Sequence, residues 1–197
     1  VSVNVDAQEL QSASFAADLA SDLAKNSVEP ATLRLEVSER AFIEDESASA
    51  HNLLELADLG IGIELDDFGA GHTSLTYLGR FPINTLKLDR KLIDKLGVDE
   101  QQAVIAKSLV DMGKNLGIEV IAEGIETRIQ LRMLMRMGCP VGQGFLLGRP
   151  MLLDHASHWL STQGGRIEQK LESMTGLFET LPTAIEYDEL GKDVAAK

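Results

Sequence analysis

The sequence has a single cysteine, few basic residues and no long apolar run. Cys139 is alone, which rules out a disulfide bond within the chain and fits the reducing conditions of a cytoplasm. No apolar run reaches the roughly 20 residues that a membrane-spanning helix needs. The first residues show no signal-peptide pattern, and the chain lacks a P-loop and a Rossmann-type glycine fingerprint. We therefore expect a cytoplasmic domain that does not itself contact a membrane, which includes the cytoplasmic part of a larger, membrane-tethered protein.

Positive charge is also scarce. The 197 residues carry 18 Lys and Arg against 31 Asp and Glu, a net charge of -13. A protein that binds DNA or RNA polymers needs a basic face, so the charge argues against such a partner. A small phosphate ligand stays compatible, because metal cations can lie between carboxylates and a phosphodiester. Solubility alone is the plainer explanation of the acidity. Only the positions of the carboxylates separate the two.

Short strand-like runs alternate with longer amphipathic runs along the chain, which predicts a parallel sheet covered by helices. About six strands and five or six helices are expected, and both a doubly wound sheet and a barrel fit that count. The predicted strands are 1–5, 33–37, 61–65, 85–88, 120–122 and 141–147, and three of the main helices are 12–25, 47–59 and 102–116. A fourth helix, which Thr127 is expected to cap, runs to Met137 and ends at Gly138.

Polar side chains recur within or just after the ends of successive predicted strands. In a (β/α) barrel these ends share one face, where active sites lie. In a doubly wound sheet a row spread over so many strands would converge less well. The pattern therefore favours a TIM-like (β/α) barrel in the α/β class. The residues in this row are Asn4, Glu36, Asp66, Asp67, Asp89 and Glu123.

Adjacent carboxylates at Asp66 and Asp67 are the strongest local signal, because they repel each other unless a cation or proton intervenes. An ordinary acidic turn is the alternative. Lys87 lies inside an apolar strand, where it could stabilise the charge of a phosphoryl group or position a water molecule. A salt bridge at the end of the barrel is an equal alternative. Glu123 suits a general base or metal ligand, and a helix-start acid is its alternative. Gln143, between two glycines, suits a base or phosphate contact, or a bulge.

Glu36 stands out because a carboxylate at the end of a buried strand is costly unless it is paired or holds a metal. A surface glutamate on an edge strand is the alternative. The histidines give no convincing metal site: His155 and His158 lie three residues apart on a predicted surface helix, where capping or contact with solvent is the better interpretation.

Four segments together resemble the EAL domain family, in its order and spacing, from Val1 to about Pro150. They are Ser2–Val5, Leu35–Glu39, Asp66–Gly71 with Leu86–Asp89, and Ala122–Thr127 with Gln143–Phe145. The resemblance implies a TIM-like barrel that cleaves cyclic di-GMP to linear pGpG with two Mg²⁺ or Mn²⁺ ions. It also implies a homodimer and an upstream sensory or diguanylate cyclase (GGDEF) domain.

The resemblance further implies a role for each matching residue. Asn4, Glu36 and Asp66 resemble ligands of one metal, and Asp66, Asp67 and Glu123 those of the second. Glu123 and Lys87 resemble the residues that orient and activate the attacking water, while Gln143 and Asp67 would contact the substrate. Glu39 and Glu126 resemble residues that support the site loops.

The chain also departs from the family pattern. The Glu-Ala-Leu strand and its helix are absent, and the chain opens on Val1 without an initiator Met. We therefore expect a piece of a longer protein that is a poor enzyme by itself. Ala70 and His72 replace a threonine and a tyrosine of the double-Asp loop. We expect the barrel domain to cover residues 1–163 and a helical, then frayed, extension to cover 164–197.

Three functions compete at this point. The retained carboxylates favour a hydrolase, and the missing first strand favours a catalytically silent cyclic di-GMP receptor. A structural dimerisation module would leave the acidic row unexplained.

Overall fold

The computed structural model describes residues 1–38, 41, 46–69, 78–139, 141–159 and 161–162. The chain divides into two compact units, Val1–Leu147 and Gly148–Lys197. The predicted domain boundary at 163/164 lies outside the described residues and stays a prediction, as do the statements on Ala70 and His72. In the second unit the described residues include a helix over 153–159.

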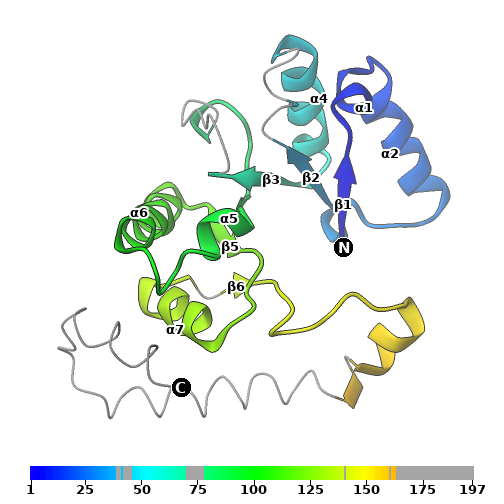
Figure 1. Ribbon diagram of the computed structural model, residues 1–197. Helices are drawn as coiled ribbons and strands as arrows, with labels where there is room; N and C mark the ends of the chain where they lie inside the picture. Colours follow the sequence, from blue (N-terminus) through cyan, green and yellow to red (C-terminus); the bar gives the residue numbers. More distant parts are fainter. Residues whose placement is uncertain (39–40, 42–45, 70–77, 140, 160, 163–197) are drawn as a thin grey trace. The chain divides into compact units, whose positions relative to one another are not determined.

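A parallel sheet forms the centre of the first unit (Figure 1). Its six strands follow one another in chain order: β1 (Ser2–Val5), β2 (Arg34–Ser38), β3 (Gly62–Phe68), β4 (Thr85–Leu88), β5 (Glu119–Ala122) and β6 (Val141–Gly142). Each strand thus pairs with the next strand of the chain, whereas a doubly wound sheet reverses its order at a switch point. The predicted α/β class and TIM-like architecture are therefore confirmed. Among the described strands, β1 and β6 are the two edges and the barrel is not closed.

Helices follow the strands and pack against the sheet, with α4 on β3 and α6 on β5. They are α1 (Ala7–Gln11), α2 (Phe15–Lys25), α4 (Glu46–Asp58), α5 (Arg90–Ile93), α6 (Glu100–Leu116) and α7 (Arg128–Met137), with a 3-10 turn, η1 (Pro30–Thr32). Thr127 caps α7 as predicted, within a capping box that Gln130 completes. Gly117 and Gly138 end α6 and α7 in the left-handed conformation.

Two predicted elements differ from the structure. The predicted helix over 12–25 begins only at Phe15, because Asp6 and Glu9 form a capping box that starts a separate helix, α1, which ends at Ser12. The predicted strand over 141–147 is reduced to Val141–Gly142. Beyond it, the chain turns to hydrogen-bond with Ile125, whose N–H donates to the carbonyl of Gln143.

The two faces of the sheet differ in chemistry. Leu35, Val37, Ile63 and Leu65 alternate along β2 and β3 and belong to the buried apolar core. The residues between them point to the opposite face, as the pleat requires. That face carries charged side chains: Arg34, Glu36, Glu64, Asp66 and Lys87. The parallel register aligns Asn4 with Glu36 and Glu36 with Glu64.

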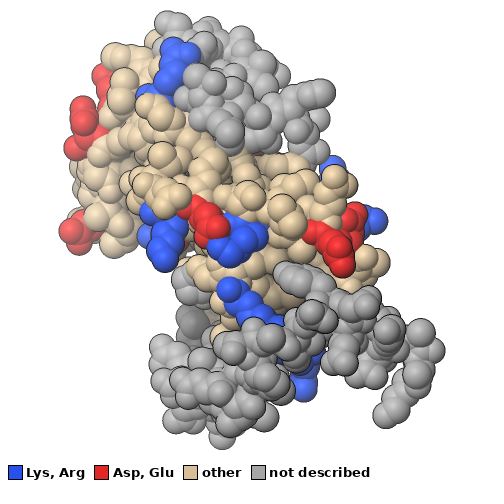
Figure 2. Space-filling view, turned by 90° about the vertical axis from the view of Figure 1, so that its left-hand side faces the viewer, with Lys and Arg blue, Asp and Glu red and all other residues tan. Residues whose placement is uncertain are grey.

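Surface charge is mixed. Figure 2 shows acidic and basic side chains interspersed over the face it presents. In the described part of the chain, no helix has the length and apolar character to cross a membrane.

Candidate active site at the carboxyl ends of the strands

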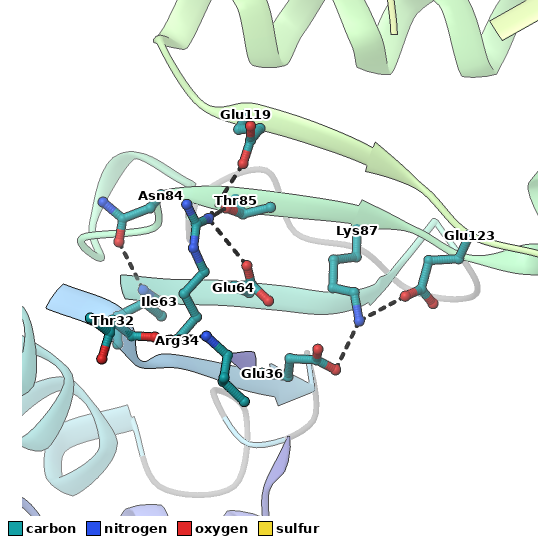
Figure 3. A network of polar contacts seen from close by, with 11 residues as sticks. Thr32, Arg34, Glu36, Ile63, Glu64, Asn84, Thr85, Lys87, Glu119 and Glu123 are labelled. Carbon is teal, nitrogen blue, oxygen red and sulfur yellow. Dashed lines mark hydrogen bonds and ion pairs between the residues drawn. The ribbon is translucent and has the colours of Figure 1, made fainter. Parts of the chain in front are cut away.

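Lys87 on β4 stands at the centre of a cluster of carboxylates from three other strands or strand ends (Figure 3). Its Nζ lies 2.7 Å from Glu123 Oε1, 2.8 Å from Glu36 Oε2 and 3.5 Å from Asp66 Oδ1. Glu36 comes from β2, Asp66 from β3, and Glu123 directly follows β5. The structure therefore brings together four residues that the sequence predicted as site residues.

The strand register explains this convergence. Neighbouring strands are parallel, so Lys87 aligns with Ile121 and Leu88 with Ala122, and Glu123 follows one residue later. The Glu123 N–H donates to the carbonyl of Leu88 and fixes the chain as it leaves β5. Because the carboxyl ends of all strands point the same way, their inward-facing side chains share one edge of the sheet.

Burial and charge act on Lys87 in opposite directions. Its side chain is only 5% exposed, and burial by itself would lower the pKa of the ammonium group. The hydrogen bonds to Glu123 and Glu36 and the charges of Glu123 and Asp66 outweigh burial and raise the pKa of Lys87 above its ordinary value. Lys87 therefore stays protonated at neutral pH and is a cation of the site, not a base.

Glu123 has a raised pKa, because burial disfavours its charged form. Lys87 opposes this effect, while the charges of Asp66 and Glu36 add to it. A carboxylate whose pKa moves toward neutrality is a better proton acceptor at neutral pH, provided that it is deprotonated. The environment of Glu123 thus suits a general base.

The double-Asp segment is unusual in backbone and in charge. Asp67 adopts a left-handed conformation, with φ of 56°, where the pairing of β3 with β4 shifts register between Leu65 and Phe68. Burial raises the pKa of Asp67, and the neighbouring charge of Asp66 and a hydrogen bond to the Asp89 side chain raise it further. Two carboxyl groups that share a hydrogen bond need a proton between them, and a bound cation could replace that proton.

Asp66 has a buried carboxylate oxygen that accepts no hydrogen bond. Its Oδ1 atom is buried and has no hydrogen-bond partner, although Lys87 Nζ lies within ion-pair distance at 3.5 Å. A buried carboxylate oxygen without a hydrogen bond is costly unless a cation or donor reaches it.

The remaining predicted residues lie around this cluster. Asn4 aligns with Glu36 at the exposed edge strand, and Gln143 is exposed just after β6. Glu126 lies further out and pairs with Arg90, its Oε1 atom 2.9 Å from Nη2. Glu39 lies outside the described residues. The supporting roles predicted for Glu39 and Glu126 stay predictions.

The residues present fit hard divalent cations, which prefer carboxylate and amide oxygens. In the described ranges, no group of three His, Cys, Asp or Glu side chains is placed to hold an ion. Glu36, Asp66 and Glu123 all turn toward Lys87, whose ammonium group lies between them. The Asp66 Oδ1 atom, which has no hydrogen bond, and the neighbouring carboxyl groups of Asp67 and Asp89 are the positions where cations would be bound.

Sequence reasoning missed a second polar network on the same face, at the opposite ends of the strands (Figure 3). Arg34 Nη1 lies 2.9 Å from Thr85 Oγ1, 3.2 Å from Glu64 Oε1 and 3.3 Å from Glu119 Oε2. Glu64 is almost fully buried. The alternation of Arg34 and Glu64 with apolar neighbours indicates that both lie on the polar face, but it does not indicate that they pair.

Comparisons with known proteins agree with this fold. The EAL domain family matches residues 1–150. The "Bifunctional diguanylate cyclase/cyclic di-GMP phosphodiesterase MucR" of Pseudomonas aeruginosa is 42% identical over 151 residues, which are 77% of this chain and 22% of that protein.

Two solved structures are also similar. The "PaMucR Phosphodiesterase, c-di-GMP complex" is 41% identical with a TM-score of 0.74, covering 79% of this chain and 63% of that one. The "Klebsiella pneumoniae BlrP1 pH 9.0 manganese/cy-diGMP complex" is 30% identical with a TM-score of 0.72, covering 76% of this chain and 38% of that one.

The fold and the carboxylate cluster define an α/β domain of the TIM-like type with its site at the carboxyl ends of the strands. The chain belongs to the EAL domain family. It spans 22% of the length of MucR and less than two thirds of either solved chain.

Proposed function

We propose that this chain hydrolyses cyclic di-GMP to linear pGpG, as a divalent-metal-dependent phosphodiesterase. One observation carries the proposal: a buried, protonated Lys87 is held among carboxylates from three other strands or strand ends, and the Asp66 Oδ1 atom beside it lacks a hydrogen bond. The similarity to MucR and to the two cyclic di-GMP complexes supports the choice of substrate.

Two divalent cations, Mg²⁺ or Mn²⁺, would supply the charge that lowers the pKa of the attacking water and neutralises the phosphoryl oxygens. Asn4, Glu36 and Asp66 would hold one cation, and Asp66, Asp67 and Glu123 the other. The similarity to a manganese complex supports a divalent ion.

The chain's own residues divide the remaining chemistry. Lys87 binds Glu123 through Oε1, so the second oxygen, Oε2, would accept the proton of the attacking water. Water adds to phosphorus, one P–O ester bond breaks, and the leaving sugar oxygen takes up a proton from solvent. The ammonium of Lys87 would stabilise the negative charge that develops on the phosphoryl oxygens. Gln143 and Asp67 would contact the substrate.

The wider setting is part of the proposal. We place the domain in the cytoplasm, beside a sensory or GGDEF domain, which the bifunctional description of MucR supports. A homodimer is supported by Val104 and Ile105, apolar side chains that α6 leaves exposed. We also retain the domain limits 1–163 and 164–197.

The test is the release of pGpG from cyclic di-GMP by the full-length protein with Mg²⁺ or Mn²⁺, beside the Asp66→Ala variant. Product that needs the metal and disappears in the variant is the expected result. Tight binding of cyclic di-GMP without any product would overturn the hydrolase and leave a silent receptor.

A further inference from the structure

Arg90 lies in a second ion pair that repeats the Lys87–Glu123 pair three residues further along the chain. Lys87 pairs with Glu123 at 2.7 Å, and Arg90 pairs with Glu126 at 2.9 Å. Arg90 is the first residue of α5, which Asp89 caps by accepting the N–H of Lys91. Two ion pairs thus connect the segment that leaves β4 with the segment that leaves β5. The Lys87–Glu123 pair lies inside the site, and the Arg90–Glu126 pair lies outside it.

The second joint also involves the backbone next to Glu123. Gly124 has φ of 73°, and a Cβ atom placed on it would lie 2.4 Å from Arg90 Cγ and 2.8 Å from Arg90 Cβ. The aliphatic part of Arg90 therefore fills the space where a side chain at position 124 would stand. Its guanidinium reaches Glu126 with Nη2 and Asp94 with Nε at 3.3 Å, so two carboxylates hold this end of the side chain.

The opposite side of this segment is fixed by backbone contacts. Ile125 is buried, its N–H donates to the Gln143 carbonyl, and its carbonyl accepts the N–H of Leu146, each at 3.0 Å. A Cβ atom on Gly144 would lie 2.2 Å from the Ile125 backbone. The segment after Glu123 therefore forms hydrogen bonds with the backbone near Gln143 and packs against the Arg90 side chain.

These contacts do not need to stabilise the fold. Arg90 is 54% exposed and Glu126 is 37% exposed, and exposed ion pairs contribute little to the stability of a fold. We propose that Arg90 is a positioning residue, which holds the segment 124–127 so that Glu123 stays in contact with Lys87. The role in turnover depends on the function proposed above. The role in ordering the segment does not.

Kinetics of the full-length protein test the first role. For Arg90→Gln we expect kcat to fall about 10- to 100-fold, because misplacing a catalytic group by about 1 Å has effects of that size. KM should stay within about twofold, since substrate contacts are unchanged. Arg90→Lys should restore part of kcat, because a lysine can reach Glu126 but cannot hold Glu126 and Asp94 together. The control is Lys107→Gln, which removes an equally exposed ion pair with Asp111 on α6 and should leave kcat unchanged.

Amide hydrogen exchange tests the second role without relying on activity. In Arg90→Gln the peptide that contains 124–127 should exchange faster, while the peptide of α6 should be unchanged. Unchanged exchange in 124–127 would overturn the proposal, as would a kcat equal to wild type in an active enzyme. If the wild-type protein gives no pGpG but exchange rises as expected, the proposed function fails and the positioning of Glu123 by Arg90 stands.

Discussion

Replacing Lys87 by Met removes the cation that balances three carboxylates. Removing one partner of a buried ion pair costs about 3–5 kcal/mol. The side chains of Glu36, Asp66 and Glu123 are 15–20% exposed to solvent. Solvent therefore reduces this cost to about 2–4 kcal/mol. For a chain of this length we expect the Tm to fall by about 5–15 °C.

The stability that Lys87→Met loses should depend on pH, and the structure predicts the direction of that dependence. Without Lys87, burial and the charges of Asp66 and Glu36 raise the pKa of Glu123 in the folded state still further above its unfolded value. The folded state then binds more protons than the unfolded state, so the stability of Lys87→Met falls as pH rises. Glu123 already has a raised pKa in the wild type and should be protonated first. The deficit relative to wild type should be larger at pH 8 than at pH 5.

Denaturant unfolding at pH 5 and pH 8, with and without Mn²⁺, measures these effects. A divalent cation can replace the lost ammonium, so Mn²⁺ should stabilise Lys87→Met more than it stabilises wild type. Lys107→Met, which breaks an exposed pair on α6, should cost at most about 1 kcal/mol at either pH. An equal deficit for Lys87→Met at both pH values would refute the electrostatic reasoning.

Two further predictions concern the carboxyl groups around Lys87, and a third concerns the network around Arg34. Glu123→Gln should lower kcat at least about 100-fold, because it removes the proposed base, while circular dichroism shows an unchanged fold; wild-type kcat would exclude that role. Calorimetry should show that Mn²⁺ binding weakens as pH falls, since Asp67 has a raised pKa and binds a cation only in its ionised form. Asp89→Asn keeps the helix cap but removes a like charge, so it should reduce this pH dependence. Arg34→Met should cost about 1–3 kcal/mol in denaturant unfolding at pH 7, because it leaves Glu64 buried beside Glu119, and Glu64→Gln in the same background should recover part of the loss.

Local patterns sufficed to predict the parts of the fold that depend on near neighbours in the chain. The alternation of Leu35 and Val37 with Glu36 predicts a strand with the glutamate on the face opposite the core, and β2 has that arrangement. The cap at Thr127 and the stop at Gly138 are equally local, and both are found.

The sequence could not predict contacts that depend on register between distant strands. Arg34 reaches Glu64 and Glu119, which are 30 and 85 residues away, and no local pattern gives that pairing. The end of β6 at Gly142, five residues earlier than predicted, likewise depends on contacts between strands. The close contact of Gly144 with the Ile125 backbone exists only once β5 and β6 are paired.

The two polar networks of the sheet differ in their balance of charge, and this difference indicates which of them binds a ligand. At one end, Arg34 meets Glu64 and Glu119, so one cation faces two carboxylates, one of which is about half exposed to water. At the other end, Lys87 meets Glu36, Asp66 and Glu123, so one cation faces three carboxylates and two negative charges are left over. Asp67 and Asp89 add further carboxyl groups beside them. A surplus of this kind lowers stability in the absence of a counterion. Divalent cations at the carboxyl ends of the strands would remove it, which is why we place the chemistry there and a structural role at the other end.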